Sequence, residues 1–183
     1  ILVVAAHPDD EILGCGGTMA IHADRGDEVY VVFMTDGVSS RGSKDSLLEN
    51  INQRKLSAME ACKEVGAQEP KFLSFPDNQM DSCSLLEITQ GLENIINKIK
   101  PEVIYTHHDK DLNVDHRLTH QAVMTACRPH PNNFISEIYS FEVLSSTGWN
   151  STSVENIFLP NVFIDLTKAW ERKMRALSFY NYE

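Results

Sequence analysis

Six consecutive residues near the start of the sequence combine side chains that can bind a metal and transfer protons. They are His7-Pro8-Asp9-Asp10-Glu11-Ile12. Imidazole and carboxylate groups are good ligands for zinc and similar divalent ions. Neighbouring residues in an extended loop point in different directions, so one Asp can bind a metal while the other faces a water molecule. Because burying several unpaired carboxylates is costly, the motif favours a metal site over an ordinary solvated turn.

A second group of candidate residues lies between positions 107 and 120. A catalytic zinc site needs about three protein ligands and an open position, and His7 and Asp10 supply two of them. The histidine-rich stretch 107–120 is the strongest source of the third. His116 and His120 are four residues apart and therefore share a helix face. We expect His116 to be the ligand, because it stands at the start of its predicted helix, next to the sheet.

The residues around these motifs predict alternating strands and helices. The predicted strands are 1–6, 28–35, 71–75, 103–106, 137–143 and 161–165, and the predicted helices are 13–24, 48–65, 84–100, 116–127 and 166–180. This alternation predicts an α/β fold with a largely parallel sheet that is covered on both faces. Ligands in such sheets bind outside the carboxyl ends of the strands. Asp36, Asp77 and the pair His107-His108 follow predicted strands and are expected at that edge.

The composition fits one globular domain over residues 1–183. Hydrophobic residues make up 42% of the chain and the net charge is −10, which argues against a nucleic-acid partner. No stretch reaches the roughly 18 to 20 apolar residues that a membrane span needs. The four cysteines are widely spaced, which predicts a reducing, cytoplasmic location without disulfides. Because Ile1 falls inside a predicted strand, we expect both natural termini to lie outside this sequence.

The candidate residues permit metal-assisted hydrolysis. Zinc lowers the pKa of the water that it binds to near neutrality. A carboxylate beside the metal can take the released proton as general base and return it to a leaving amine, and Asp9 suits this role. Attack on an amide or ester carbonyl builds an oxyanion, which the metal and a neighbouring donor such as a protonated histidine would stabilise.

The motif Ala6-His7-Pro8-Asp9-Asp10-Glu11, with Asn113-Val114-Asp115-His116 downstream, resembles the PIG-L/LmbE-like family of zinc-dependent N-deacetylases. Supporting similarities are the Thr35-Asp36-Gly37 turn, Arg54, Pro76-Asp77 and Ser145-Ser146-Thr147. The resemblance covers nearly the whole chain. It implies a Rossmann-like three-layer sandwich that removes acetyl groups from N-acetylglucosamine-type sugars or sugar conjugates. It also implies one Zn²⁺ per chain on His7, Asp10 and His116, with Asp9 as the base.

Two positions depart from the family pattern. Many relatives carry a histidine that stabilises the transition state where this chain has Asn113, and His107, His108 or His120 could replace it. Relatives often have Gly-Glu where this chain has Asp36-Gly37, so the substrate pocket is expected to differ. We therefore name His107 and His120 as further catalytic candidates. The expected substrate-binding residues are Asp36, Arg54, Asp77, His108 and Asn113.

Two other functions stay open from the sequence. The first is a metal-dependent phosphoesterase, because acidic strand ends also hold magnesium, although histidine ligands favour zinc. The second is a non-catalytic sugar-binding protein on the same fold, with Asn113 marking lost chemistry. The leading hypothesis takes a small N-acetyl sugar or sugar conjugate as partner. A homo-oligomer is a reasonable expectation, because symmetric assemblies are common.

Overall fold

The computed structural model describes residues 1–41, 46–129, 134–150 and 153–180. The strands are β1 (Leu2–Ala5), β2 (Tyr30–Phe33), β3 (Lys71–Phe72), β4 (Val103–His107) and β5 (Glu137–Phe141). The helices are α1 (Asp10–Asp24), α2 (Leu47–Glu64), α3 (Leu85–Ile99), α4 (Val114–Ala126) and α5 (Trp170–Ser178). None of the helices in these ranges is long and apolar enough to cross a membrane.

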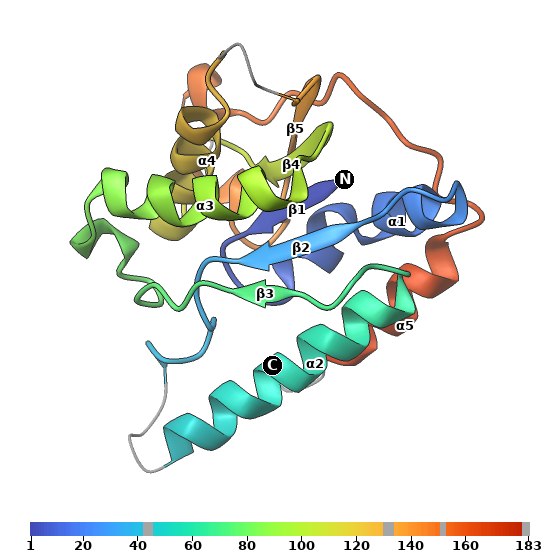
Figure 1. The fold of residues 1–183 in the computed structure, drawn as a ribbon, viewed down its shortest axis with the longest axis horizontal. Coiled ribbons are helices and arrows are strands. Elements are labelled where there is room, and N and C mark those ends of the chain that lie inside the picture. The colour runs from blue at the N-terminus through green and yellow to red at the C-terminus, as the bar shows by residue number, and fades with distance from the viewer. Residues whose placement is uncertain (42–45, 130–133, 151–152, 181–183) are drawn as a thin grey trace.

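The five strands form one parallel sheet in the order β3-β2-β1-β4-β5 (Figure 1). The two motif-bearing strands, β1 and β4, lie side by side at its centre, where Leu2 pairs with Ile104 and Val3 with Tyr105. Parallel pairing brings their carboxyl ends to the same edge. The prediction of a mostly parallel α/β sheet is confirmed.

Side chains of β1 alternate between two hydrophobic cores. Val3 and Ala5 pack with residues of α1, α2 and α5 on one face. Leu2 and Val4 pack with residues of α3 and α4 on the other. All four side chains are fully buried, which explains why this strand is a continuous apolar run without polar alternation. The molecule is therefore the three-layer sandwich that the sequence predicts.

The first motif itself starts helix α1. The carbonyl of Asp9 accepts hydrogen bonds from the amides of Ile12 (3.0 Å) and Leu13 (2.9 Å), so the helix begins at Asp10 and not at the predicted residue 13. Gly14 lies against Phe141 of β5, where an added Cβ would clash with the ring at 2.2 Å. The glycine thus lets α1 pack closely against the sheet.

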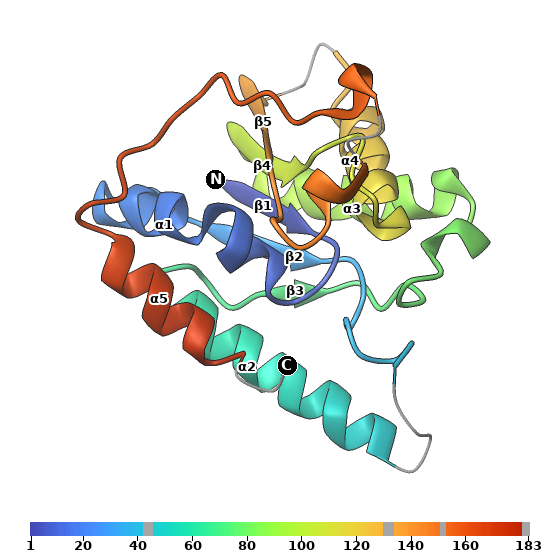
Figure 2. The same ribbon diagram turned by 180° about the vertical axis from the view of Figure 1, so that it is seen from behind.

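The strand predicted at 161–165 is wrong. These residues pair with no strand in the described chain, and Phe163 is 80% exposed. The segment leads from the side of α4 across to α5 (Figure 2). The apolar run Val162-Phe163-Ile164 gives local strand propensity, but a strand also needs a partner for its backbone, and this run has none.

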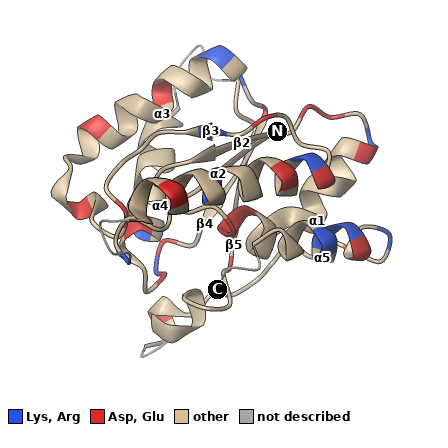
Figure 3. Cartoon of the chain, turned by 90° about the horizontal axis from the view of Figure 1, so that it is seen from below, with Lys and Arg blue, Asp and Glu red and all other residues tan. Residues whose placement is uncertain are grey.

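Helix α5 is shorter than predicted and is anchored to α1 and α2 by polar contacts. Arg172 Nη1 lies 2.5 Å from Asp24 Oδ1, Lys173 Nζ donates to the Leu13 carbonyl at 2.8 Å, and Arg175 Nε lies 2.8 Å from Glu64 Oε1. Figure 3 shows the basic residues on α5. These contacts fix the C-terminal helix next to the element that carries the first motif.

Candidate metal centre and active site

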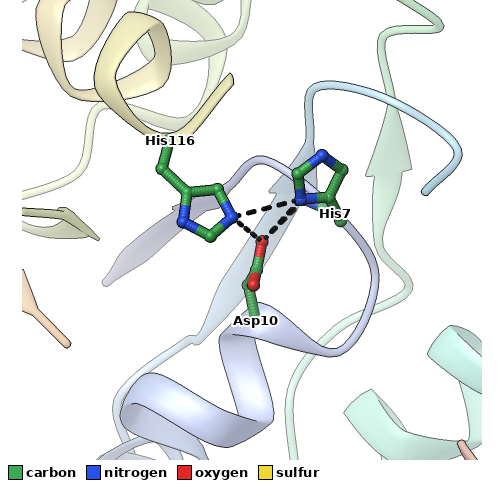
Figure 4. A group of neighbouring side chains, drawn as sticks. All are labelled: His7, Asp10 and His116. Carbon is green, nitrogen blue, oxygen red and sulfur yellow. Dashed lines mark hydrogen bonds and ion pairs between the residues drawn. The ribbon is translucent and has the colours of Figure 1, made fainter. Parts of the chain in front are cut away.

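Three side chains from two distant segments converge at the carboxyl edge of the sheet. His7 follows β1, Asp10 opens α1, and His116 lies in the first turn of α4 (Figure 4). Asp10 Oδ2 is 3.1 Å from His7 Nδ1 and 3.2 Å from His116 Nε2. The two histidine nitrogens are 3.2 Å apart. The three ligand atoms form a nearly equilateral triangle.

This triangle fits a tetrahedral zinc ion. Zinc bonds to nitrogen and oxygen are about 2.0 to 2.2 Å long, so neighbouring ligand atoms in a tetrahedron are separated by roughly 3.3 Å. Two imidazoles and one carboxylate form a common catalytic zinc set that leaves a fourth position open. Magnesium and calcium prefer sites made of oxygen ligands alone. The donor chemistry and the spacing therefore fit a zinc ion better than magnesium or calcium.

Each histidine of the triangle is oriented by a carboxylate on its other ring nitrogen. His7 Nε2 lies 3.1 Å from Asp115 Oδ2 and 3.5 Å from Asp77 Oδ1. His116 Nδ1 lies 3.2 Å from Asp111 Oδ1. Carboxylates behind metal-bound histidines fix the ring orientation and the tautomer and raise ligand basicity.

The orienting carboxylates are themselves fixed by hydrogen bonds. Asp111 Oδ2 accepts from Thr147 Oγ1 at 2.6 Å and from Ser146 Oγ at 3.0 Å. Asp115 Oδ2 accepts from the Asn78 amide at 2.7 Å. His7, Asp77 and Asp115 also bring ligand atoms within 4.8 Å of one another, but we interpret this second group as the support for His7, because the Asp115 oxygens already accept backbone amides.

The same contacts determine the charges in the site. Burial opposes the positive charge on His7, but hydrogen bonds to Asp10 and Asp115 raise its pKa to about 10. Burial likewise opposes the charge on His116, but the Asp10 and Asp111 carboxylates raise its pKa to about 9. Asp111 is buried, yet its bonds from His116 and Thr147 lower its pKa to about 2. Two cations and their carboxylates thus balance one another around the triangle.

Asp9, which directly precedes Asp10, has an unusual backbone conformation. Its φ is 123° and its ψ is −34°, a region that costs a non-glycine residue on the order of 1–3 kcal/mol and is found mostly at functional sites. The carboxylate is 18% exposed, and Arg54 Nη1 lies 3.7 Å from its Oδ2. The Asp9 amide donates to Oε2 of the buried Glu11 at 2.9 Å. Asp9 is therefore held through both its side chain and its backbone.

His107 supports the triangle from behind. It is fully buried, its ring stacks on His116 with centroids 3.9 Å apart, and its Nε2 accepts the Ala6 amide at 2.9 Å. Burial and the neighbouring His116 hold its pKa well below the ordinary value. His107 thus packs against His116, with its Nε2 also 3.5 Å from Asp10 Oδ2, and its catalytic role stays a prediction.

His120 and His108 lie on other surfaces of the same strand end. His120 Nδ1 contacts the His107 carbonyl at 2.8 Å, and its side chain lines a cavity of about 590 Å³ with Asp81 and Arg117. The ring of His108 packs edge-on against Phe158 with centroids 5.3 Å apart. Neither histidine is among the side chains that converge with Asp10.

Three of the predicted substrate-binding residues have structural duties in the loops of this edge. Asp36 Oδ1 accepts the amides of Val38 (2.9 Å) and Ser39 (2.7 Å). Asp77 Oδ2 accepts the amide and the hydroxyl of Ser40, at 2.9 and 2.6 Å. Asn113 caps α4 by accepting the Asp115 amide at 2.8 Å, and its Nδ2 donates to Asn78 Oδ1 at 3.1 Å. These residues shape the rim of the site.

Sequence reasoning missed four residues that serve the site: Glu11, Asp111, Asp115 and Tyr180. Asp111 and Asp115 precede His116 by five positions and one position, and this closeness in sequence was the available signal. Glu11 belongs to the first motif, but nothing in a sequence tells that its partner is a tyrosine 169 positions away.

The fold and the site together define a Rossmann-like α/β protein with a candidate His₂-Asp metal centre at the carboxyl edge of its sheet. Residues 2–127 match the family model described as PIG-L, GlcNAc-PI de-N-acetylase. The chain therefore belongs to the PIG-L family, which confirms the resemblance inferred from its motifs.

Curated relatives are similar over most of this chain. YaiS, an uncharacterized deacetylase of Escherichia coli K12, is 34% identical over 168 residues, which cover 89% of this chain and 80% of the relative. A probable N-acetyl-α-D-glucosaminyl L-malate deacetylase 2 of Bacillus cereus is 25% identical over 182 residues, covering 97% and 80%.

Solved structures share the fold. An N,N'-diacetylchitobiose deacetylase from Pyrococcus horikoshii aligns with a TM-score of 0.77 and 23% identity over 98% of this chain and 68% of that one. The 4-carboxy-2-hydroxymuconate hydratase of Pseudomonas putida KT2440 aligns with the same TM-score and 25% identity, over 100% and 78%. The fold thus occurs with more than one chemistry, so the function must be argued from the site.

Proposed function

We propose that this protein is a zinc-dependent hydrolase that removes the acetyl group from an N-acetylated sugar or sugar conjugate. One observation carries the proposal: His7, Asp10 and His116 form a zinc-sized triangle, and Asp9 directly precedes Asp10 in the chain. Membership of the PIG-L family and the deacetylase names of the relatives support it. An N-acetylglucosamine-type sugar is the substrate class that these names share most often.

His7, Asp10 and His116 would hold the zinc, with Asp111 and Asp115 orienting the two imidazoles. When bound, zinc supplies a water of lowered pKa and a Lewis acid for the acyl oxygen. Asp9 Oδ2 takes the proton from the attacking water and passes it to the departing nitrogen. The amide C–N bond breaks, and acetate and a free amino sugar leave.

Arg54 and the Asp9 backbone contacts keep the base in place for this proton transfer. We assign His107 a supporting role, because its Nε2 already accepts the Ala6 amide. Asn113 has no proton to donate as an acid, and both ends of its amide are engaged in the rim. The contributions of Asp36, Arg54, Asp77, His108 and Asn113 to substrate binding stay predictions.

Acetate release from a panel of N-acetyl sugars and their conjugates tests the proposal. The zinc-loaded protein should release acetate from at least one class, and a chelator should abolish the reaction until zinc is restored. The same protein should be assayed for hydration of 4-carboxy-2-hydroxymuconate, the substrate named for the structurally similar hydratase. Hydration without any acetate release would overturn the deacetylase proposal.

A further inference from the structure

The proposed base, Asp9, is connected through Glu11 to a residue far away in the sequence. Glu11 follows Asp10 in the sequence, but its side chain turns back into the core and is fully buried. Its Oε2 accepts the Asp9 amide at 2.9 Å, and its Oε1 accepts the hydroxyl of Tyr180 at 2.6 Å. Tyr180 follows the last residue of α5 by two positions. The end of the described chain is thus linked to the backbone of Asp9 through one carboxylate.

The ring of Tyr180 makes a second link to the same residue. The guanidinium of Arg54 lies over this ring, with its central carbon 5.6 Å from the centroid, in the range of a cation–π contact. Arg54 Nη1 in turn lies 3.7 Å from Asp9 Oδ2. Tyr180 therefore contacts both groups that hold Asp9: Glu11 at the backbone amide and Arg54 at the carboxylate.

Glu11 and Arg54 are both buried, so water cannot readily replace Tyr180 as their partner. Arg54 is 7% exposed and Tyr180 is 6% exposed. Burial raises the pKa of Glu11 to about 7, while hydrogen bonds from Tyr180 and the Asp9 amide favour its ionised form. A buried acceptor that loses its donor is costly, which keeps the three residues in one arrangement.

We propose that Tyr180 is a positioning residue for Asp9, acting through Glu11 and Arg54. The inference rests on the proposed function, in which Asp9 is the base. It explains how the unfavourable φ of 123° at Asp9 is maintained, because a strained backbone persists only where its surroundings fix it. Helix α5 thereby becomes part of the catalytic apparatus without contacting the substrate.

The test compares Tyr180→Phe with Tyr139→Phe at equal zinc content. Both substitutions remove a tyrosine hydroxyl that donates to a glutamate, at 2.6 Å in Tyr180 and at 2.7 Å in the half-buried Tyr139, whose hydrogen bond is exposed. We expect Tyr180→Phe to lower kcat about tenfold with KM within twofold, because a small misplacement of a catalytic group is costly. Tyr139→Phe should leave both constants unchanged.

A double-mutant cycle distinguishes positioning from a general structural role. If Tyr180 acts through Asp9, the Tyr180→Phe change should lower the residual rate of an Asp9→Asn protein less than twofold. An equal tenfold loss in both backgrounds would overturn the proposal. Glu11→Gln is the second variant, and its kcat should fall with that of Tyr180→Phe, because the Asp9 amide and the Tyr180 hydroxyl approach different oxygens of Glu11 and the NH2 group that replaces one of them cannot accept.

Amide hydrogen exchange gives a readout that does not depend on deacetylation. Tyr180→Phe should raise the exchange rate of the Asp9 amide at least tenfold, while the amides of β1 keep their rates. If the protein shows no deacetylase activity but Tyr180→Phe still speeds exchange of the Asp9 amide, the proposed function is refuted and the positioning role of Tyr180 is supported. An unchanged Asp9 amide in a folded Tyr180→Phe protein would refute the positioning role by itself.

Discussion

At the residue scale, the site depends as much on the carboxylates behind the histidines as on the ligands. Asp111 and Asp115 each contact the outer nitrogen of one histidine, and each is fully buried. Their oxygens are occupied by hydroxyl and amide donors, so they have little freedom to move. The candidate metal site is therefore preorganised by residues outside the His7, Asp10 and His116 triangle.

Replacing Asp111 with Asn should weaken zinc binding by about 10- to 100-fold, because the ring of His116 loses its orienting charge. Asp109→Asn is the matched control: it lies in the same loop, is 46% exposed at its side chain and contacts only His108 and Lys110 among the ion pairs of the described chain. Competition with a chromophoric chelator measures both dissociation constants. Equal affinities for the two variants would contradict the role given to Asp111.

The raised pKa values of His7 and His116 predict that zinc binding releases protons. Both imidazoles are protonated near pH 7 in the metal-free protein, because their pKa values are about 10 and 9, and a ligand must be neutral to bind. Calorimetry in buffers of different ionisation enthalpy should therefore show release of about two protons at pH 7, and the affinity should rise with pH. Zinc binding without proton release would contradict these protonation states.

The stability of the metal-free protein should depend on pH in the opposite direction to zinc affinity. Because both pKa values lie above the ordinary 6.5, these contacts stabilise the metal-free fold most fully below pH 6.5. The contribution is lost as the pH rises through about 9 to 10. Urea unfolding of the metal-free protein at pH 6 and pH 9 checks this direction.

At the element scale, the loop after β2 supports the first motif. Gly37 has a φ of +72°, and a Cβ there would lie 3.1 Å from Pro8 Cδ and 3.2 Å from His7 Cβ. The glycine therefore serves two needs, a turn of positive φ and a close approach to a metal ligand. The contact with His7 explains why small size matters at this position.

Gly37→Ala should destabilise the fold by about 1 kcal/mol and also weaken zinc binding about tenfold, since the new methyl group presses on His7. Gly26→Ala separates the two effects, because Gly26 has a φ of +90° with open space around it. Its expected cost is backbone strain alone, with zinc affinity unchanged. If both variants bind zinc as the parent does, the loop does not support the ligand.

At the scale of the whole molecule, the sheet topology explains why the position of the candidate site could be predicted from the sequence. Parallel strands place their ends at one edge, so polar residues after β1 and β4 had to meet, and His7, Asp10 and His116 do. Contacts without a local signal could not be predicted. Tyr180 reaches Glu11 across 169 positions, and residues 161–165 carry strand propensity without a strand beside them.

The catalytic roles expected for His107 and His120 stay predictions, because spacing in the sequence does not decide where a side chain packs. By the alternation of side chains along β4, His107 lies on the α1 face of the sheet. Its ring packs against the rings of His116 and Phe141. His120 lies one helical turn beyond His116 and contacts the His107 carbonyl. Their order in the chain is compatible with either a catalytic or a supporting role. The packing of α4 on the sheet decides which side chains lie near Asp10.

The most direct test of the account is the rate of acetate release by Asp9→Asn at a zinc content equal to that of the parent. Asn has nearly the same shape as Asp but cannot accept the proton. The account predicts that zinc affinity stays within a few-fold, while kcat falls by about 10² to 10⁴. Parental activity in a zinc-loaded Asp9→Asn protein would contradict the assignment of Asp9 as the base and with it the proposed mechanism.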